Sequence, residues 1–129
     1  MLDPKALKAE EDRIKQEVSQ LDPLSRKKFH TFCAENLKDP DTYAALAWSL
    51  PVGLHHFYLG NKKRAFLDIG LCFAGVFCLF IFNLRLLGLL VIMGVVMTEF
   101  RALFRSQVIV QNYNVRLMKY AKSKIIKYS

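Results

Sequence analysis

Cysteine is scarce in this sequence and follows no pattern that would pair it. The 129 residues include three cysteines, Cys33, Cys72 and Cys78, an odd number without a CxxC motif. Such a set does not suggest a disulfide framework. Cys72 and Cys78 lie inside an apolar run, where a thiol acts as a small hydrophobic side chain. We therefore predict no disulfide.

The sequence also lacks residues arranged for a known kind of catalysis. It contains no Ser-His-Asp set, no glycine-rich phosphate loop and no paired catalytic carboxylates at a credible site. We predict that the protein is not an enzyme and holds no cofactor. Residues 1–16 are charged and have no apolar core, so they do not form a signal peptide. We expect residues 1–40 to stay in the cytoplasm.

Acidic residues become rare after the first third of the chain. Residues 1–42 carry eight Lys/Arg and nine Asp/Glu, whereas residues 43–129 carry eleven and two, so the net charges are −1 and +9. A strongly basic soluble domain would suggest nucleic acid as a partner. Here the basic residues flank apolar runs, and that placement favours anionic lipid headgroups. We therefore predict a lipid bilayer as the partner and no nucleic acid.

The sequence does contain three Asp-Pro pairs, Asp3-Pro4, Asp22-Pro23 and Asp39-Pro40. Asp is a favoured N-cap and Pro suits the first helical position, so each pair predicts the start of a helix. Helices over about 4–20 and 23–37 each have an apolar stripe and would form an amphipathic hairpin. This hairpin is too small to bury a core alone. We expect it to dock on the membrane surface or on a partner.

Two apolar runs in the second half predict a transmembrane helical hairpin. Residues 65–84 are apolar except for Asp68 and Asn83, and a spanning helix needs about 20 such residues. We take this run as the strongest transmembrane segment, with residues 85–100 returning across the bilayer after a tight turn at Asn83-Leu84-Arg85. The predicted fold class is an all-α integral membrane protein.

The segment 42–60 decides how many times the chain crosses the bilayer. It has no formal charge at neutral pH but is interrupted by Pro51 and Gly53. The positive-inside rule places the basic cluster at 62–64 and the basic tail in the cytoplasm. The N-terminal arm can be cytoplasmic as well only if 42–60 forms a short interfacial or re-entrant helix. The alternative has three spans and an exported arm.

The tail is basic throughout. Residues 101–129 hold seven Lys/Arg and no acid, with apolar residues at roughly helical spacing. Such a helix is suited to lying in the headgroup region. We therefore divide the chain into a cytoplasmic amphipathic arm (1–40), a membrane domain (41–102) and a basic amphipathic tail (103–129).

Two acidic residues lie within the apolar runs. A carboxylate in a transmembrane helix is by default a candidate functional group. Asp68 lies near a helix start and four residues after Arg64, so we favour an anchoring role over a proton or ion path. In the hairpin, Glu99 would reach the same depth. The two helices could then be joined by an ion pair, either of Glu99 with Lys62–Arg64 or of Asp68 with Arg101.

His55 and His56 are the first candidates for metal binding. Adjacent histidines point to different faces of a helix and rarely bind one ion unless the backbone is irregular. His30 and Cys33 would complete a set of four ligands, the number that zinc favours, but nothing in the sequence brings them together. We predict no metal site.

A stripe of small residues runs along the first apolar segment. Gly70, Ala74 and Cys78 are spaced four apart, an arrangement that lets helices approach closely, and Gly88 and Gly94 interrupt the facing run. The stripe would seat either the hairpin or a second copy of the protein. We favour the hairpin.

The segment after Trp48 resembles the signature of the TM-two domain family, Gly-x-(His/Asp)-Arg-Phe-Tyr-x-Gly. The residues that carry the resemblance are Gly53, His55, Phe57, Tyr58 and Gly60, while His56 stands where the family has Arg. Glu99 stands roughly where members often have a late Asp. The resemblance covers residues 43–102. It implies a short membrane domain with two transmembrane helices and no established biochemical function, and the charged arm is more like the bacterial members.

We therefore expect an integral protein of the bacterial inner membrane with both termini in the cytoplasm. Its expected role is a non-enzymatic membrane adaptor or scaffold, with a membrane-protein partner or a second copy as its binding partner. The alternative is a small channel or an ion- or metal-handling protein. Five basic residues are expected to face lipid headgroups: Lys62, Lys63, Arg64, Arg101 and Arg105.

Overall fold

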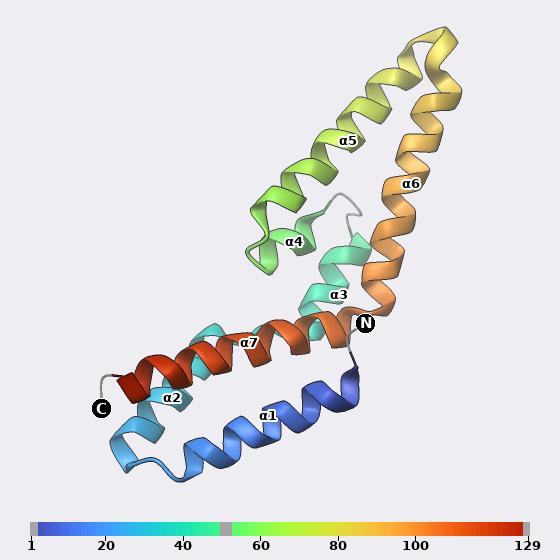
Figure 1. Cartoon of the computed structure of the whole chain (residues 1–129). Helices are drawn as coiled ribbons and strands as arrows, with labels where there is room; N and C mark the ends of the chain where they lie inside the picture. The colour runs from blue at the N-terminus through green and yellow to red at the C-terminus, as the bar shows by residue number, and fades with distance from the viewer. Residues whose placement is uncertain (1–2, 50–52, 128–129) are drawn as a thin grey trace. The chain divides into compact units, whose positions relative to one another are not determined.

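The computed structural model describes residues 3–49 and 53–127 and contains no strand within these ranges (Figure 1). The chain divides into two compact units, one formed by residues 1–39 with 108–129 and the other by residues 40–107. The sequence predicted an all-α fold, and the helical content confirms it. The N-terminal arm and the C-terminal tail, treated above as separate parts, belong to one unit.

The first unit consists of α1 (Pro4–Ser19), α2 (Pro23–Asn36) and most of α7 (Ser106–Lys127). The first two helices begin at the predicted Asp-Pro pairs. The carboxylate of Asp3 accepts a hydrogen bond from the backbone N–H of Lys5, and that of Asp22 accepts one from Ser25. These contacts satisfy N–H groups that have no partner inside the helix, which is why the helices start there.

The apolar stripes of these three helices meet in one core. Its buried members are Ile14, Val18, Phe29, Cys33, Val115, Met118 and Ala121, with Leu21, Phe32 and Ile125 packed against them. The hairpin of α1 and α2 therefore docks on α7 of the same chain. The apolar residues of α7 that the sequence placed at the headgroup region contribute to this core.

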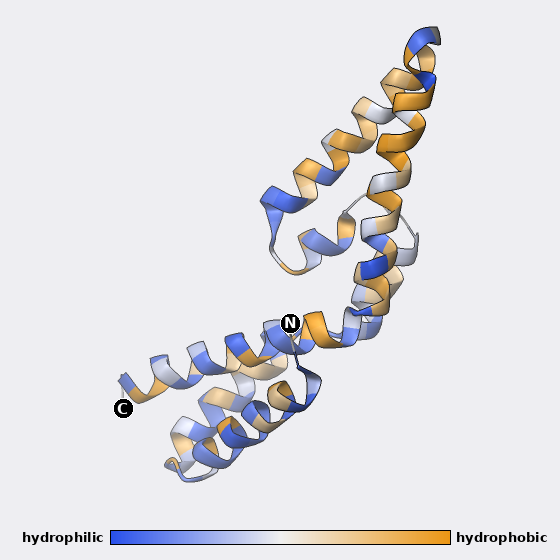
Figure 2. Ribbon diagram, turned by 45° about the vertical axis from the view of Figure 1, so that its right-hand side comes forward, coloured by the Kyte–Doolittle hydropathy of each residue, from blue (hydrophilic) through white to orange (hydrophobic). Residues whose placement is uncertain are grey.

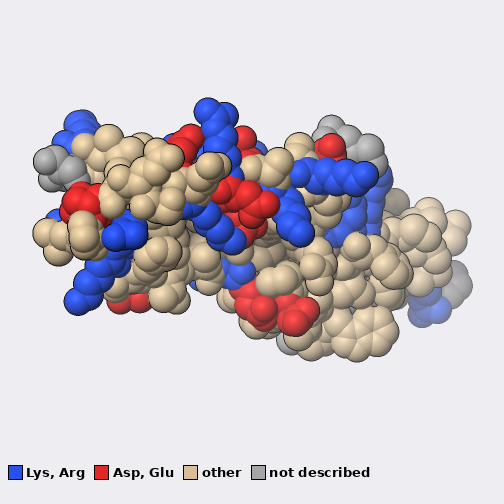
Figure 3. Space-filling model, turned by 90° about the horizontal axis from the view of Figure 1, so that it is seen from below, with Lys and Arg blue, Asp and Glu red and all other residues tan. Residues whose placement is uncertain are grey.

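Ion pairs add to the contact between α1 and α7. Lys119 Nζ lies 2.9 Å from Glu10 Oε1, and Lys122 pairs with Glu17. Gln111 donates a hydrogen bond to Glu11 across the same interface. The face seen in Figure 3 shows acidic side chains next to basic ones. The charge asymmetry along the sequence is thus partly offset once the acidic arm packs on the basic tail.

The second unit is built on α5 (Lys62–Phe80) and α6 (Arg85–Phe104), two antiparallel helices that form a hairpin (Figure 1). The first helix ends four residues before the predicted boundary, because Ile81 adopts an extended conformation and 82–84 form a short 3-10 turn, η1 (Phe82–Leu84). The second continues beyond residue 100 to Phe104. The predicted hairpin is present, with a slightly earlier turn.

The two helices approach each other closely at Gly75 and Gly88. A Cβ atom added to Gly88 would lie 2.6 Å from the carbonyl oxygen of Gly75, and one added to Gly75 would lie 2.8 Å from a side-chain carbon of Ile92. The predicted stripe is placed differently. Gly70 and Ala74 are exposed, and a Cβ added to Gly70 would meet no atom within 4 Å. Of that stripe only Cys78 lies near the crossing.

Two short helices, α3 (Pro40–Ser49) and α4 (Leu54–Tyr58), pack at the open end of the hairpin. The segment 42–60 is therefore not one continuous helix. Its predicted break at Pro51 lies outside the described residues, but the predicted irregularity at Gly53 is present. Gly53 and Gly60 flank α4 with φ values of +84° and +75°, a left-handed conformation that favours glycine.

Figure 2 shows that the α5–α6 hairpin is apolar along most of its length. Within residues 3–49 and 53–127, α6 is the one helix long and apolar enough to cross a membrane. The buried residues of α6 include Gly88, Val95 and Glu99. The sequence had taken residues 65–84 as the strongest transmembrane segment, but α5 does not qualify as a candidate span and carries Lys62, Lys63, Arg64 and Asp68 near its start.

Candidate functional site

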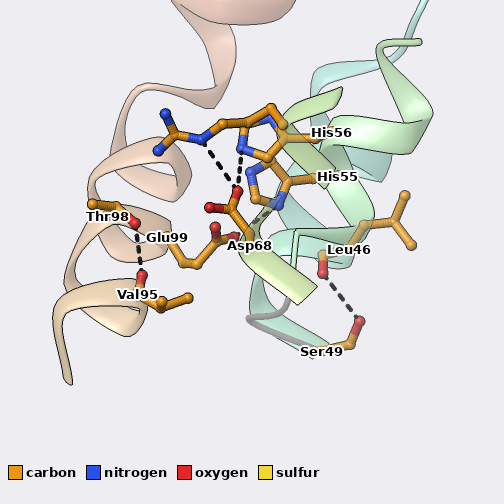
Figure 4. A network of polar contacts seen from close by, with 9 residues as sticks. Leu46, Ser49, His55, His56, Asp68, Val95, Thr98 and Glu99 are labelled. Atoms are coloured by element: carbon orange, nitrogen blue, oxygen red, sulfur yellow. Dashed lines mark hydrogen bonds and ion pairs between the residues drawn. The ribbon is translucent and has the colours of Figure 1, made fainter. Parts of the chain in front are cut away.

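A cluster of four polar side chains lies where α4 packs against the open end of the hairpin. His55 and His56 come from α4, Asp68 from the second turn of α5, and Glu99 from α6. Figure 4 shows the two imidazoles next to each other, with both carboxylates directed toward them. His55, Asp68 and Glu99 are buried and His56 is half-buried. Three of the four titratable groups are therefore shielded from bulk solvent.

The rings of the adjacent histidines His55 and His56 lie side by side. In a long helix, neighbouring side chains diverge. In α4, which has five residues and a left-handed glycine on each side, the ring centroids of His55 and His56 are 4.1 Å apart. Gly53 also allows close approach to α5, since a Cβ there would lie 3.0 Å from the Cβ of Asp68.

Asp68 is held by two partners. Its Oδ2 lies 3.2 Å from Nε of Arg64, one helical turn earlier, and 3.3 Å from Nε2 of His56. The Arg64 contact is the i, i+4 pair expected from the sequence, but the contact with His56 was not foreseen. A buried carboxylate needs such partners, because burying an unpaired charge is costly. Asp68 thus joins α4 to α5.

The contact between His55 and Glu99 is incomplete. Nδ1 of His55 lies 3.0 Å from Oε2 of Glu99, but the two groups are not oriented as a hydrogen bond. Within the described part of the chain, both ring nitrogens of His55 and Oε2 of Glu99 are buried without a hydrogen-bond partner. Leaving a buried polar group in that state costs about 1–3 kcal/mol. A bound water or ion is one way in which such groups are satisfied.

Burial changes the acid–base properties of the groups that α3 and α4 contribute. It lowers the pKa of His56, an effect to which the neighbouring His55 adds. Burial, together with the charge of Glu99, raises the pKa of Tyr43 to about 12. The Tyr43 ring stands edge-on to the ring of His55, with centroids 4.9 Å apart. Burial therefore favours the neutral imidazole of His56 and the neutral phenol of Tyr43.

Two cavities reach the carboxylates of the cluster. One, of about 160 Å³, is lined by Ala47, Trp48, Glu99, Phe100 and Leu103. The other, of about 320 Å³, lies between α5 and α6 and is lined by Arg64, Asp68, Thr98 and apolar residues of both helices. Each carboxylate thus borders a space large enough for water molecules or a small ion.

Of the residues singled out in the sequence, the structure unites His55, His56, Asp68 and Glu99. Glu99 pairs with His55 instead of with the basic cluster at 62–64. Phe57 packs against Phe66 of α5, with ring centroids 5.2 Å apart. Tyr58 is the last residue of α4, and Gly60 follows the helix with a positive φ. These motif residues shape the segment that carries the histidines.

Other predicted residues lie elsewhere. His30 and Cys33 are in α2 of the first unit, where His30 is exposed and Cys33 belongs to the core. Arg101 is exposed and Arg105 half-buried at the end of α6. Tyr43 was missed by sequence reasoning. The one signal for it was its spacing of four residues from Ala47, which places both buried residues on one face of α3.

No protein-family model matches this chain, and no match was found among curated proteins or solved structures. The resemblance to the TM-two domain family therefore stays a proposal based on the segment 53–60. The function has to be inferred from the geometry of the chain itself.

Proposed function

We propose that this chain is a non-enzymatic membrane adaptor, whose α5–α6 hairpin lies in the lipid bilayer and whose three-helix unit lies in water. The observation that carries the proposal is the exposure of large apolar side chains along both helices of the hairpin. Those more than 60% exposed are Phe66, Phe73, Phe77, Phe80, Leu86, Met97 and Phe104. Water-soluble proteins rarely expose so continuous an apolar surface.

The dimensions of the hairpin suit a bilayer. Helices of 19 and 20 residues are roughly 28 and 30 Å long, close to the hydrocarbon thickness of about 30 Å. The glycine contact between Gly75 and Gly88 is the kind of small-residue crossing that joins helices in lipid, where apolar surface alone provides no attraction between them.

The charged residues are placed as a bilayer requires. Asp68 and Glu99 would lie below the membrane surface, but both are buried in the protein, Asp68 beside Arg64 and His56 and Glu99 beside His55. Ionisable groups at that depth are tolerated when they face the protein interior. The basic residues at the open end, Lys62, Lys63, Arg64, Arg101 and Arg105, are placed to meet anionic headgroups. The positive-inside rule then puts this end in the cytoplasm.

The three-helix unit supports the adaptor role. It has its own apolar core and exposes both acidic and basic side chains, so it is suited to an aqueous environment. A folded unit tethered to a membrane anchor, without a recognisable catalytic set in the sequence, fits a protein that recruits or holds a partner at the cytoplasmic face. The resemblance to the TM-two domain family supports the same membrane assignment.

Cysteine accessibility in intact cells tests the placement. In a chain with Cys33, Cys72 and Cys78 replaced by alanine, Asn83→Cys at the hairpin turn should react with an impermeant maleimide added outside. Lys63→Cys, at the open end, should react only after the cells are permeabilised. Labelling of both or neither position in intact cells would contradict a hairpin that crosses the bilayer.

Purification in mild detergent tests the adaptor role separately. We expect a defined partner, a second copy or bound anionic lipid to accompany the chain. A lone monomer without lipid preference would contradict the adaptor proposal even if the hairpin crosses the bilayer.

An ion-handling role is the second candidate, and the cavities beside Asp68 and Glu99 favour it. Reconstituted vesicles should then show an ion flux that Asp68→Asn reduces. Equal flux in both proteins would exclude Asp68 from an ion path.

A further inference from the structure

We propose that His55, His56 and Glu99 form a binding site for a divalent transition-metal ion of the zinc class. One nitrogen of each imidazole and one carboxylate oxygen lie within 4.8 Å of one another, and the side chains are buried or half-buried. This inference concerns the cluster itself and does not depend on whether the hairpin lies in a membrane.

The unsatisfied atoms of the cluster point to a ligand. His55 is fully buried, and within residues 3–49 and 53–127 neither of its ring nitrogens has a hydrogen-bond partner. Oε2 of Glu99 is in the same state, although it lies 3.0 Å from Nδ1 of His55. Nδ1 of His55 and Oε2 of Glu99 are both atoms that can ligate a metal. They lie 3.0 Å apart without forming a hydrogen bond, as two ligands of one ion would. A bound cation would satisfy both and would balance the charge of Glu99.

The donor set selects the class of ion. Two imidazole nitrogens and one carboxylate oxygen suit zinc and neighbouring first-row metals. Magnesium and calcium prefer sites made of oxygen ligands, so they fit this cluster poorly. Three protein ligands leave at least one coordination position open, as in zinc sites that bind a further water or small ligand.

Asp68 is placed to orient His56, one of the proposed metal-ligating side chains, and does not serve only as a helix anchor. Its Oδ2 lies 3.3 Å from Nε2 of His56, and Arg64 holds the same oxygen from the other side. A carboxylate that accepts the N–H of a metal-bound histidine fixes the tautomer and the orientation of the ring. The pair of Arg64 and Asp68 would thus position His56 for the ion.

The cluster also has a route by which an ion can reach it. The cavity of about 160 Å³ that Glu99 lines is bordered by Trp48 and Phe100, whose ring centroids are 6.3 Å apart. The opposite cavity reaches Asp68. An ion entering the first cavity would meet Glu99, the one carboxylate in its lining, and Figure 4 shows that this side chain points toward the two histidines.

Metal titration of the purified full-length chain in detergent tests the proposal. The protein is stripped with a chelator and titrated with Zn²⁺ against a chromophoric competitor, and we expect one ion per chain. His55→Ala, His56→Ala and Glu99→Gln should each weaken binding by at least about tenfold, and Asp68→Asn by about 10–100-fold. Excess Mg²⁺ should not displace Zn²⁺. His30→Ala, an exposed histidine in the other unit, is the matched control and should bind as the parent does.

Two further measurements separate the proposal from its rivals. Co²⁺ in place of Zn²⁺ should give visible absorption without a sulfur charge-transfer band, because the proposed site has no cysteine ligand. Far-UV circular dichroism of each variant shows whether it folds. If His55→Ala does not fold, Glu99→Gln, which keeps the shape of the side chain, is the variant that tests the site. A parent chain that binds no Zn²⁺, or binding that Glu99→Gln and His56→Ala leave unchanged, would overturn the proposal.

Discussion

Replacing Gly88 with alanine tests the helix crossing on which the second unit is built. The added Cβ would lie 2.6 Å from the carbonyl oxygen of Gly75 and 3.0 Å from the backbone nitrogen of Leu79. Both neighbours are backbone atoms, so no change of side-chain rotamer can relieve the contact. The two helices must move apart by several tenths of an ångström.

The expected cost follows from two opposing effects. Overpacking a tight contact typically costs about 1–3 kcal/mol. Alanine in place of glycine inside a helix gains roughly 1 kcal/mol, because glycine has more backbone freedom to lose. Gly94→Ala on the same helix is the matched control, since a Cβ there meets no atom within 4 Å. Gly94→Ala should therefore show the favourable effect of alanine without the overpacking cost. The free energies of unfolding of the two variants should differ by about 1–3 kcal/mol.

Unfolding in SDS from a mild detergent is a suitable assay. Far-UV circular dichroism follows all helices, and Trp48, the one tryptophan in the sequence, reports on the second unit through its contact with Phe100 of α6. We expect Gly88→Ala to unfold at lower SDS than Gly94→Ala by both probes. Equal midpoints would show that the helices do not cross at Gly75 and Gly88, and the hairpin geometry would have to be rejected.

Three further predictions concern the motif glycines and the first unit. Gly53→Ala should destabilise more than Gly60→Ala in the same assay, because both have positive φ but only at Gly53 would a Cβ crowd α5; the reverse order would contradict the close approach. Phe29→Ala should lower the free energy of unfolding of the first unit by about 3–5 kcal/mol in urea melts, and a loss below 1 kcal/mol would mean that the α1–α2–α7 core is not formed. Hydrogen bonds and charges from lysines of α7 hold the pKa of Glu10 and Glu17 below the ordinary value of 4.5, so their stabilisation should be complete above that pH and lost as the pH falls below it. Urea melts of the parent chain and of the Glu10→Gln/Glu17→Gln double variant should then converge at acid pH, and a constant difference would refute the pairing.

Much of the local structure could be predicted because it depends on neighbouring residues. Asp-Pro pairs mark helix starts whatever lies around them, since the cap needs only the carboxylate and the N–H groups that follow it. The two apolar runs were correctly read as a hairpin for a similar reason. The packing at the helix crossing could not be predicted. The predicted stripe contained Ala74, whereas the contact is made by its neighbour Gly75. Which of two adjacent residues faces the other helix depends on how each helix is rotated about its own axis.

The partners of the charged groups were also beyond the sequence. Asp68 and Arg64 are one turn apart, so their contact could be foreseen. The contacts of His55 with Glu99 and of His56 with Asp68 join residues of separate helices, and they depend on the two left-handed glycines that turn α4 against the hairpin. The sequence argument against a metal site assumed that adjacent histidines point to different faces of a helix. In the structure the rings of His55 and His56 lie side by side, with centroids 4.1 Å apart.

The sequence by itself determined that the chain is helical, where several helices begin and which segments are apolar, because these properties follow from capping, periodicity and composition. Only the tertiary structure decided that the arm and the tail share one core, and that two histidines and two carboxylates from three helices meet in one buried cluster. Such contacts depend on the relative positions of whole helices, which no local pattern of residues specifies.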